Sequence, residues 1–190
     1  MRRCWQSLIL CFLPLLTACN LAVSDHAMFA PQDQLTTPLK NGLWAADDPD
    51  CKFDSAAARA TWPNCAFWVI INDNKIVDVA GDKEEDRPAG FLIVGGVPPL
   101  VQIEMIEKGE HGYLFFALDP SASETSGRVT AAQVWPVMCG VTKSGSTSQV
   151  DPYPGFNKEC QPATTAALRA AAIASRPKSD EAPLRWIRAE

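Results

Sequence analysis

The stretch Tyr113-Leu114-Phe115-Phe116-Ala117-Leu118 is apolar throughout, and it decides the fold class of this chain. Successive side chains of a β-strand point to opposite faces of its sheet, so a strand of this composition has no face suited to water. It needs cover on both sides. The sequence therefore predicts a β structure in which this strand lies between two buried layers.

The residues before this stretch alternate in polarity. Val101, Ile103 and Met105 are separated by Gln102 and Glu104, which is typical of a sheet with one buried face. Asp119-Pro120 is expected to end the apolar strand, with a polar loop over 121–127. Further strands are predicted at residues 42–44, 91–94, 128–135 and 184–188.

Two β-rich runs, 66–71 and 75–79, flank the polar residues Asn72-Asp73-Asn74 and predict a hairpin. Thr164 or Thr165 can cap an Ala-rich helix over 166–175, and a shorter helix is expected over 55–60. The expected fold is mainly β. An antiparallel sheet curls into a roll or barrel, with one C-terminal Ala-rich helix packed on it.

The amino terminus has the layout of a secretory signal. Arg2 and Arg3 precede the apolar run 8–16, which is about half the ~20 residues that a membrane-spanning helix needs. The run ends in Leu16-Thr17-Ala18-Cys19, which resembles the lipobox of bacterial lipoproteins. The resemblance covers residues 1–19 only, and it implies cleavage before Cys19, diacylation of its thiol and acylation of the new amino terminus. The alternative is an ordinary signal peptide with a chance cysteine.

This resemblance predicts three segments. Residues 1–18 are a signal peptide, 19–38 a flexible tether from lipidated Cys19, and 39–190 a single disulfide-stapled β-rich domain. In enteric lipoproteins an Asp after the cysteine is an inner-membrane retention signal; here the residue is Asn20. We therefore expect the periplasmic face of the outer membrane, with the acyl chains on Cys19 as the membrane contact.

Charge argues against nucleic acid as a partner. Removal of residues 1–18 leaves 172 of the 190 residues; it removes two of the 17 basic side chains and none of the 22 acidic ones, so the formal net charge becomes −7. A chain of this charge without a basic stripe is a poor match for phosphate backbones or anionic headgroups.

The seven cysteines divide by compartment. Cys4 and Cys11 leave with the signal and Cys19 takes lipid, so an even number remains in the exported domain, which indicates disulfides. Three pairings are possible, and we favour the one that closes two short loops. No pair has C-x-x-C spacing and no His lies nearby, so a metal site is the weaker alternative. The disulfide candidates are Cys51 with Cys65 and Cys139 with Cys160.

Catalytic candidates are few. The mature chain holds only His26 and His111, and the sequence lacks G-x-S-x-G, H-E-x-x-H and phosphate-binding glycine loops, so we expect neither an enzyme nor a cofactor. The acidic groups at 47–54 and 82–86 are expected to be solvated turns, with Ca²⁺ binding by the first as the less favoured alternative.

Five tryptophans remain in the mature chain. They could line a ligand pocket at a barrel mouth or fill the core. The ones considered as ligand or partner contacts are Trp44, Trp68 and Trp186. The leading hypothesis is a non-enzymatic lipoprotein that binds another envelope component, for which a protein is the favoured class. The alternative is a lipocalin-like carrier of a small apolar ligand, which is an architectural analogy only. A periplasmic hydrolase or enzyme inhibitor is a weaker third hypothesis.

Overall fold

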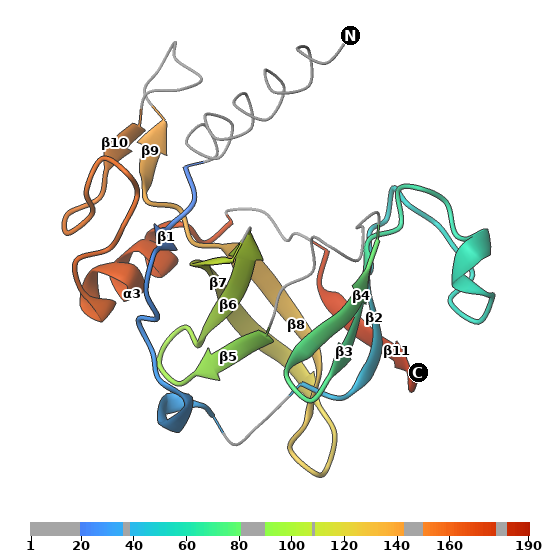
Figure 1. Ribbon diagram of the computed structural model, residues 1–190. Helices are drawn as coiled ribbons and strands as arrows, with labels where there is room; N and C mark the ends of the chain where they lie inside the picture. Colours follow the sequence, from blue (N-terminus) through green and yellow to red (C-terminus); the bar gives the residue numbers. More distant parts are fainter. Residues whose placement is uncertain (1–19, 36–38, 81–89, 108, 143–149, 178–181) are drawn as a thin grey trace, which may run out of the picture.

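The computed structural model describes residues 20–35, 39–80, 90–107, 109–142, 150–177 and 182–190. The chain forms a nearly closed, antiparallel, barrel-like sheet with a single α-helix near the carboxyl terminus (Figure 1). The strand order is β4-β3-β2-β11-β8-β7-β6-β5. The predicted fold class is confirmed. These strands span Gly42–Ala46 (β2), Trp68–Asn72 (β3), Lys75–Val79 (β4), Gly90–Val94 (β5), Leu100–Glu107 (β6), Glu110–Ser123 (β7), Val129–Pro136 (β8) and Leu184–Arg188 (β11).

Strand β7 is buried on both faces, as its sequence predicts. Phe115 and Ala117 are 1% and 0% exposed and face an outer layer, whereas Phe116 and Leu118 pack in the barrel interior. The strand does not end at Asp119-Pro120 as expected. It continues to Ser123, paired with β8, and the pairing register shifts beyond Pro120. Such a shift accommodates a residue that cannot donate a backbone hydrogen bond.

The barrel interior is filled by side chains. Trp44 is 1% exposed and packs with apolar residues from the other seven strands of the barrel, including Ile71, Ile93 and Leu118. The gap between the first and last strands is narrow, since the Phe91 N–H donates to the Asn74 carbonyl at 3.0 Å. The barrel is therefore a packed core rather than an open container.

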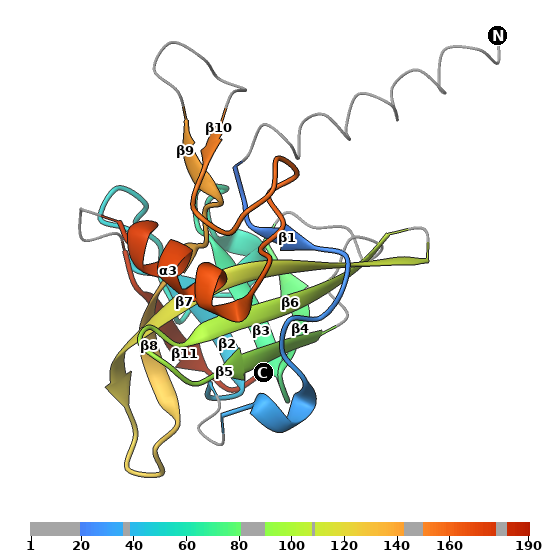
Figure 2. The same cartoon turned by 90° about the vertical axis from the view of Figure 1, so that its left-hand side faces the viewer.

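Helix α3 (Thr165–Ala174) covers the outer face of β5 to β8 (Figure 2). Thr164 caps it, accepting a hydrogen bond from the Ala167 N–H at 3.1 Å, as predicted. The small side chains Ala171 and Ala172 are fully buried and allow a close approach to the sheet. The Trp135 indole N–H donates to the Ala172 carbonyl at 3.0 Å and so ties β8 to the helix.

A disulfide-closed loop covers a second outer face, over β2 and β3. Cys51 and Cys65 are bridged with a Cα–Cα distance of 5.8 Å, and Trp62 inside the loop packs over Leu43 and Ile70. The helix expected over 55–60 is wrong. The loop contains only a 3₁₀ turn, Arg59–Thr61, and the Asp54 carboxylate accepts from the Ala56 N–H in a tight local turn.

The β3–β4 hairpin is confirmed. Asp73 and Asn74 both have positive φ angles, 46° and 61°, at its turn. Two consecutive left-handed residues give a turn whose twist matches that of the flanking strands, and Asp and Asn tolerate this conformation better than most side chains.

The prediction of a flexible tether over 19–38 is wrong for residues 20–35, which are packed on the domain. Strand β1 (Val23–Ser24) pairs with β7, and Ala22 and Phe29 are buried in the outer core beside α3. The Gln102 side chain fixes this segment, because its carboxamide oxygen accepts from the N–H groups of Met28 and Phe29 and its NH₂ group donates to the Phe29 carbonyl. The domain therefore includes the segment that directly follows Cys19.

Loss of the Phe115 ring should test how strongly the fold depends on the doubly covered strand. We expect Phe115→Ala to lower the free energy of unfolding by about 3–5 kcal/mol, as for other buried aromatic residues. Phe67→Ala is the matched control, since Phe67 is 47% exposed, and should stay within about 0.5 kcal/mol of the parent. Urea unfolding curves measure both, and equal losses would contradict the assignment of Phe115 to the core.

Candidate functional site

A largely apolar pocket lies on the outside of the barrel. It has a volume of about 370 Å³ between the β5–β6 loop, β7, β8 and the last turn of α3. Its walls include Val97, Pro98, Pro99, Ile173 and, at the base, Trp135. Val97 is 90% exposed and Ile173 is 60% exposed. We call the surface formed by Val97, Pro98, Pro99 and Ile173 the apolar rim.

The loop that carries Val97, Pro98 and Pro99 is held by Arg169 of α3. One guanidinium nitrogen donates to the Gly95 carbonyl at 2.5 Å, and the guanidinium fills the space that a Cβ on Gly96 would need. Gly96 has a φ of 136°, and a side chain there would collide with the Arg169 guanidinium. On the far side the Leu118 N–H donates to the Pro99 carbonyl at 3.0 Å. The exposed apolar residues are thus presented on a braced loop.

A single ion pair lines the pocket near Trp135. The Arg176 guanidinium contacts the Asp119 carboxylate, and it also lies over the Trp135 ring at 5.4 Å from the centroid. Both charges lie at the surface, so the pair contributes little stability by itself. It gives the otherwise apolar pocket one polar edge that could orient an incoming group.

The three tryptophans considered as contacts lie in two environments: Trp44 and Trp186 pair on the neighbouring strands β2 and β11 and pack in the same interior cluster, whereas Trp68 lies outside it. Trp44 is in the barrel interior, and its indole N–H donates to the Lys40 carbonyl at 2.8 Å. Trp186 is partly buried at the end of the barrel, with the Lys40 ammonium 3.6 Å from its ring centroid. Trp68 packs against the disulfide loop, beside the Arg59 guanidinium. The tryptophan that lines the pocket is Trp135.

Both disulfides form in the pairing favoured from the sequence. The Cys139–Cys160 bridge has a Cα–Cα distance of 5.2 Å, which with the 5.8 Å of Cys51–Cys65 lies in the usual range for such bridges. The second bridge joins the end of β8 to the loop before α3. Disulfides of this kind are typical of exported domains.

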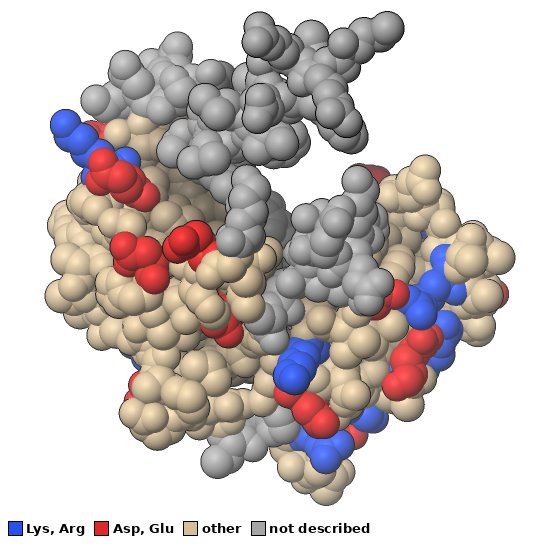
Figure 3. Space-filling model, in the orientation of Figure 1, with Lys and Arg blue, Asp and Glu red and all other residues tan. Residues whose placement is uncertain are grey.

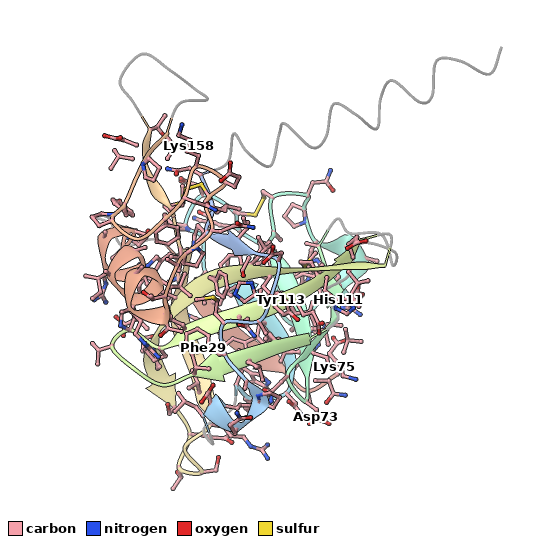
Figure 4. The ribbon with its side chains drawn as sticks, turned by 60° about the vertical axis from the view of Figure 1, so that its left-hand side comes forward. Phe29, Asp73, Lys75, His111, Tyr113 and Lys158 are labelled. Carbon is pink, nitrogen blue, oxygen red and sulfur yellow. A yellow bond between two sulfur atoms is a disulfide. The ribbon has the colours of Figure 1, made fainter. Side chains whose placement is uncertain are left out.

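His111 is paired with a carboxylate on the β6–β7 hairpin. Its Nδ1 lies 2.7 Å from a Glu104 oxygen, and the Tyr113 hydroxyl approaches the same oxygen at 3.4 Å (Figure 4). Burial, with the Glu104 charge adding to it, raises the pKa of the Tyr113 hydroxyl. Histidine and tyrosine both contact Glu104 rather than each other, so His111 is not placed to activate that hydroxyl.

His26 has both a carboxylate and a hydroxyl as neighbours. Its Nδ1 lies 2.6 Å from Asp25 and 3.4 Å from the Ser24 hydroxyl, and the hydrogen bond from His26 lowers the pKa of Asp25. In a catalytic triad the acid and the hydroxyl bond to opposite ring nitrogens. Here both approach the same nitrogen, and the buried Ser24 hydroxyl donates to the His26 carbonyl.

The acidic residues near the first disulfide make a local turn hydrogen bond and an ion pair. Asp48 accepts from the Asp50 N–H and Asp47 pairs with Arg185 at 2.8 Å. Within the described part of the chain, no three His, Cys, Asp or Glu side chains are grouped to hold a metal ion. The acidic loop at 82–86 and Cys19 lie outside the described residues.

Surface charge and helix length give two further observations. On the face shown in Figure 3, the described residues on the left-hand side are mainly acidic where they are charged, and those on the right-hand side mix acidic and basic side chains without a continuous basic strip. Among those same residues, no helix is long and apolar enough to cross a bilayer.

Comparison with known proteins gives no relative. No family model matches the chain, and neither a curated protein nor a solved structure resembles it closely enough to be a match.

Substitution of Gly96 should test the bracing of the loop. Gly96→Ala combines an unfavourable backbone conformation with a shift of the Arg169 guanidinium away from the Gly95 carbonyl, and we expect it to lower the free energy of unfolding by roughly 3 kcal/mol. Gly109→Ala is the control, because Gly109 also has a positive φ, 86°, but no atom within 4 Å of an added Cβ. It should cost only about 1–2 kcal/mol. Equal losses in thermal or urea unfolding would show that Arg169 does not brace the loop.

Proposed function

We propose that this chain is a lipid-anchored lipoprotein of the bacterial cell envelope, and that its β domain is a non-enzymatic module that binds another envelope protein. The observation that carries the binding role is the apolar rim, where exposed Val97 on a braced loop and exposed Ile173 on α3 flank a pocket. Exposed apolar residues gathered around a pocket mark interaction sites more often than scattered ones do.

The physical character of the rim supports a protein partner. Pro98 and Pro99 restrict the loop, and so do the contacts of Arg169 at Gly96. Little conformational entropy is therefore lost when a partner docks. The pocket behind the rim is large enough for one or two apolar side chains, and the Arg176–Asp119 pair offers polar contacts at its edge. A buried anchor residue surrounded by a polar margin is the usual arrangement of a protein interface.

The filled barrel disfavours the carrier hypothesis. A barrel-like fold is compatible with a lipocalin-like protein, but such a carrier holds its ligand inside the barrel. Trp44 and Leu118 occupy that space here and are 1% and 3% exposed. An apolar ligand of drug size would require these side chains to move.

The lipid anchor is supported by the lipobox resemblance of Leu16-Thr17-Ala18-Cys19 and by the two disulfides, which fit an oxidising compartment. Two or more acyl chains hold a protein stably on a bilayer, whereas one chain binds only marginally. The periplasmic face of the outer membrane is the proposed location.

Replacement of Cys19 tests the anchor. In cells, Cys19→Ala should prevent incorporation of radiolabelled palmitate and leave the 18-residue signal attached, because both steps need the thiol of that cysteine. Cys11→Ala is the control: it removes a cysteine from the apolar run and should be labelled and cleaved normally. Intact mass and palmitate labelling measure both variants. Palmitate labelling of the Cys19→Ala protein would contradict the proposal.

Photocrosslinking tests the binding role. A photoreactive amino acid at Val97 should give a defined crosslinked protein in whole cells, and Ile173→Asp in the same protein should abolish it by placing a charge in the apolar rim. Val77, which is 44% exposed on β4, is the control position and should give no product. No crosslink at Val97, or the same product from both positions, would refute docking at the rim.

A further inference from the structure

Asn20, the residue that directly follows Cys19, is fixed firmly in the domain. Its side chain is 5% exposed and donates to the Gly140 carbonyl at 2.6 Å. Its own carbonyl accepts from the Cys139 N–H at 2.8 Å, and its φ is 56°. These contacts place Asn20 where β9 (Gly140–Thr142) begins, beside the Cys139–Cys160 disulfide.

The residues that follow Asn20 are also held to the domain by backbone hydrogen bonds. The Ala22 N–H donates to the Val137 carbonyl at 2.7 Å, and the Val23 N–H donates to the Cys160 carbonyl at 3.0 Å. Leu21 forms a bridge with Met138. The chain is therefore bonded from its first described residue to both partners of a disulfide-linked scaffold.

We infer that the acylated protein lies directly on the bilayer in one orientation, with the end of the molecule around Asn20, β9 and β10 (Val150–Pro152) as its lipid-facing surface. The inference rests on the proposed acylation of Cys19. One residue spans at most about 3.3–3.6 Å, whereas a flexible tether of sixteen residues would span about 20–24 Å. The anchor can therefore not move far from Asn20.

The surface at this end carries one exposed apolar side chain beside charged ones. Val141 of β9 is 59% exposed, next to the Gly140 carbonyl that holds Asn20. Lys158 is exposed in the loop that leads to Cys160, and the carboxylates of Asp151 in β10 and of Glu159 are exposed at the same end, so the charge of this surface is mixed. Figure 4 shows Lys158 at one end of the molecule and Asp73 and Lys75, at the β3–β4 hairpin, at the opposite end. The hairpin turn thus lies well away from the proposed lipid-facing surface.

Spin labels on two matched lysine positions test the orientation. Full-length acylated protein carrying a nitroxide-labelled unnatural amino acid at position 158 or position 75 is reconstituted into vesicles of phosphatidylethanolamine and phosphatidylglycerol. Collision of the label with a water-soluble nickel chelate is measured by electron paramagnetic resonance. We expect a clear loss of nickel accessibility at position 158 relative to the same protein in detergent, and no loss at position 75.

A linker variant provides the second arm. Insertion of about ten Gly and Ser residues between Cys19 and Asn20 adds a flexible span of on the order of 16–19 Å and should restore nickel accessibility at position 158. Acylated protein with equal accessibility at the two positions, or a linker without effect, would overturn the fixed orientation while leaving the anchor intact. Protein that carries no acyl chain by mass spectrometry would instead refute the proposed anchor on which the inference depends.

Discussion

The constraint on which the structure depends is that strand β7 needs cover on two faces. Phe116 and Leu118 require an interior, which the sheet supplies by curling until β4 and β5 nearly meet. Phe115 and Ala117 require an exterior layer, which α3 and the amino-terminal segment supply. A sheet that curls around one face and is covered on the other has few exposed surfaces. A binding surface can therefore form at the β5–β6 loop and at the ends of the barrel.

This double cover also separates the candidate site from the barrel interior. The inner face of the sheet is packed with large side chains such as Trp44, and the outer face is packed beneath α3. Space for a ligand or partner remains where the outer cover ends, at the last turn of α3 beside the β5–β6 loop. Trp135 belongs both to the outer cover and to the pocket, because its indole N–H donates to α3 and its side chain forms the base of the pocket.

Much of the sheet could be predicted from local patterns, whereas the site could not. Alternation in 101–105, the Asn72-Asp73-Asn74 turn and the Thr164 cap each act within a few residues, and the strand, the turn and the cap were confirmed. The single buried face expected for 101–105 was wrong, because Gln102 is 3% exposed beneath the amino-terminal segment. The packing of 20–35 depends on Gln102, more than seventy residues away, so a segment without periodicity looked like a tether. The pocket likewise depends on Arg169 meeting Gly95 and Gly96, which no local pattern indicates; an unusual Gly95-Gly96 before two prolines was its only sequence signal.

The amino-terminal segment has two roles that cannot be separated physically. It completes the outer cover of β7 through Ala22 and Phe29, and it begins one residue after the proposed site of acylation. Detaching it would expose apolar surface on β7 and break the hydrogen bonds of Asn20 to the disulfide-linked scaffold. The free energy that keeps the segment packed is therefore the same free energy that keeps the domain close to the bilayer. If the amino-terminal segment detached from β7, it would become a flexible tether between the anchor and the domain. The orientation of the apolar rim relative to the bilayer therefore depends on the stability of the outer core.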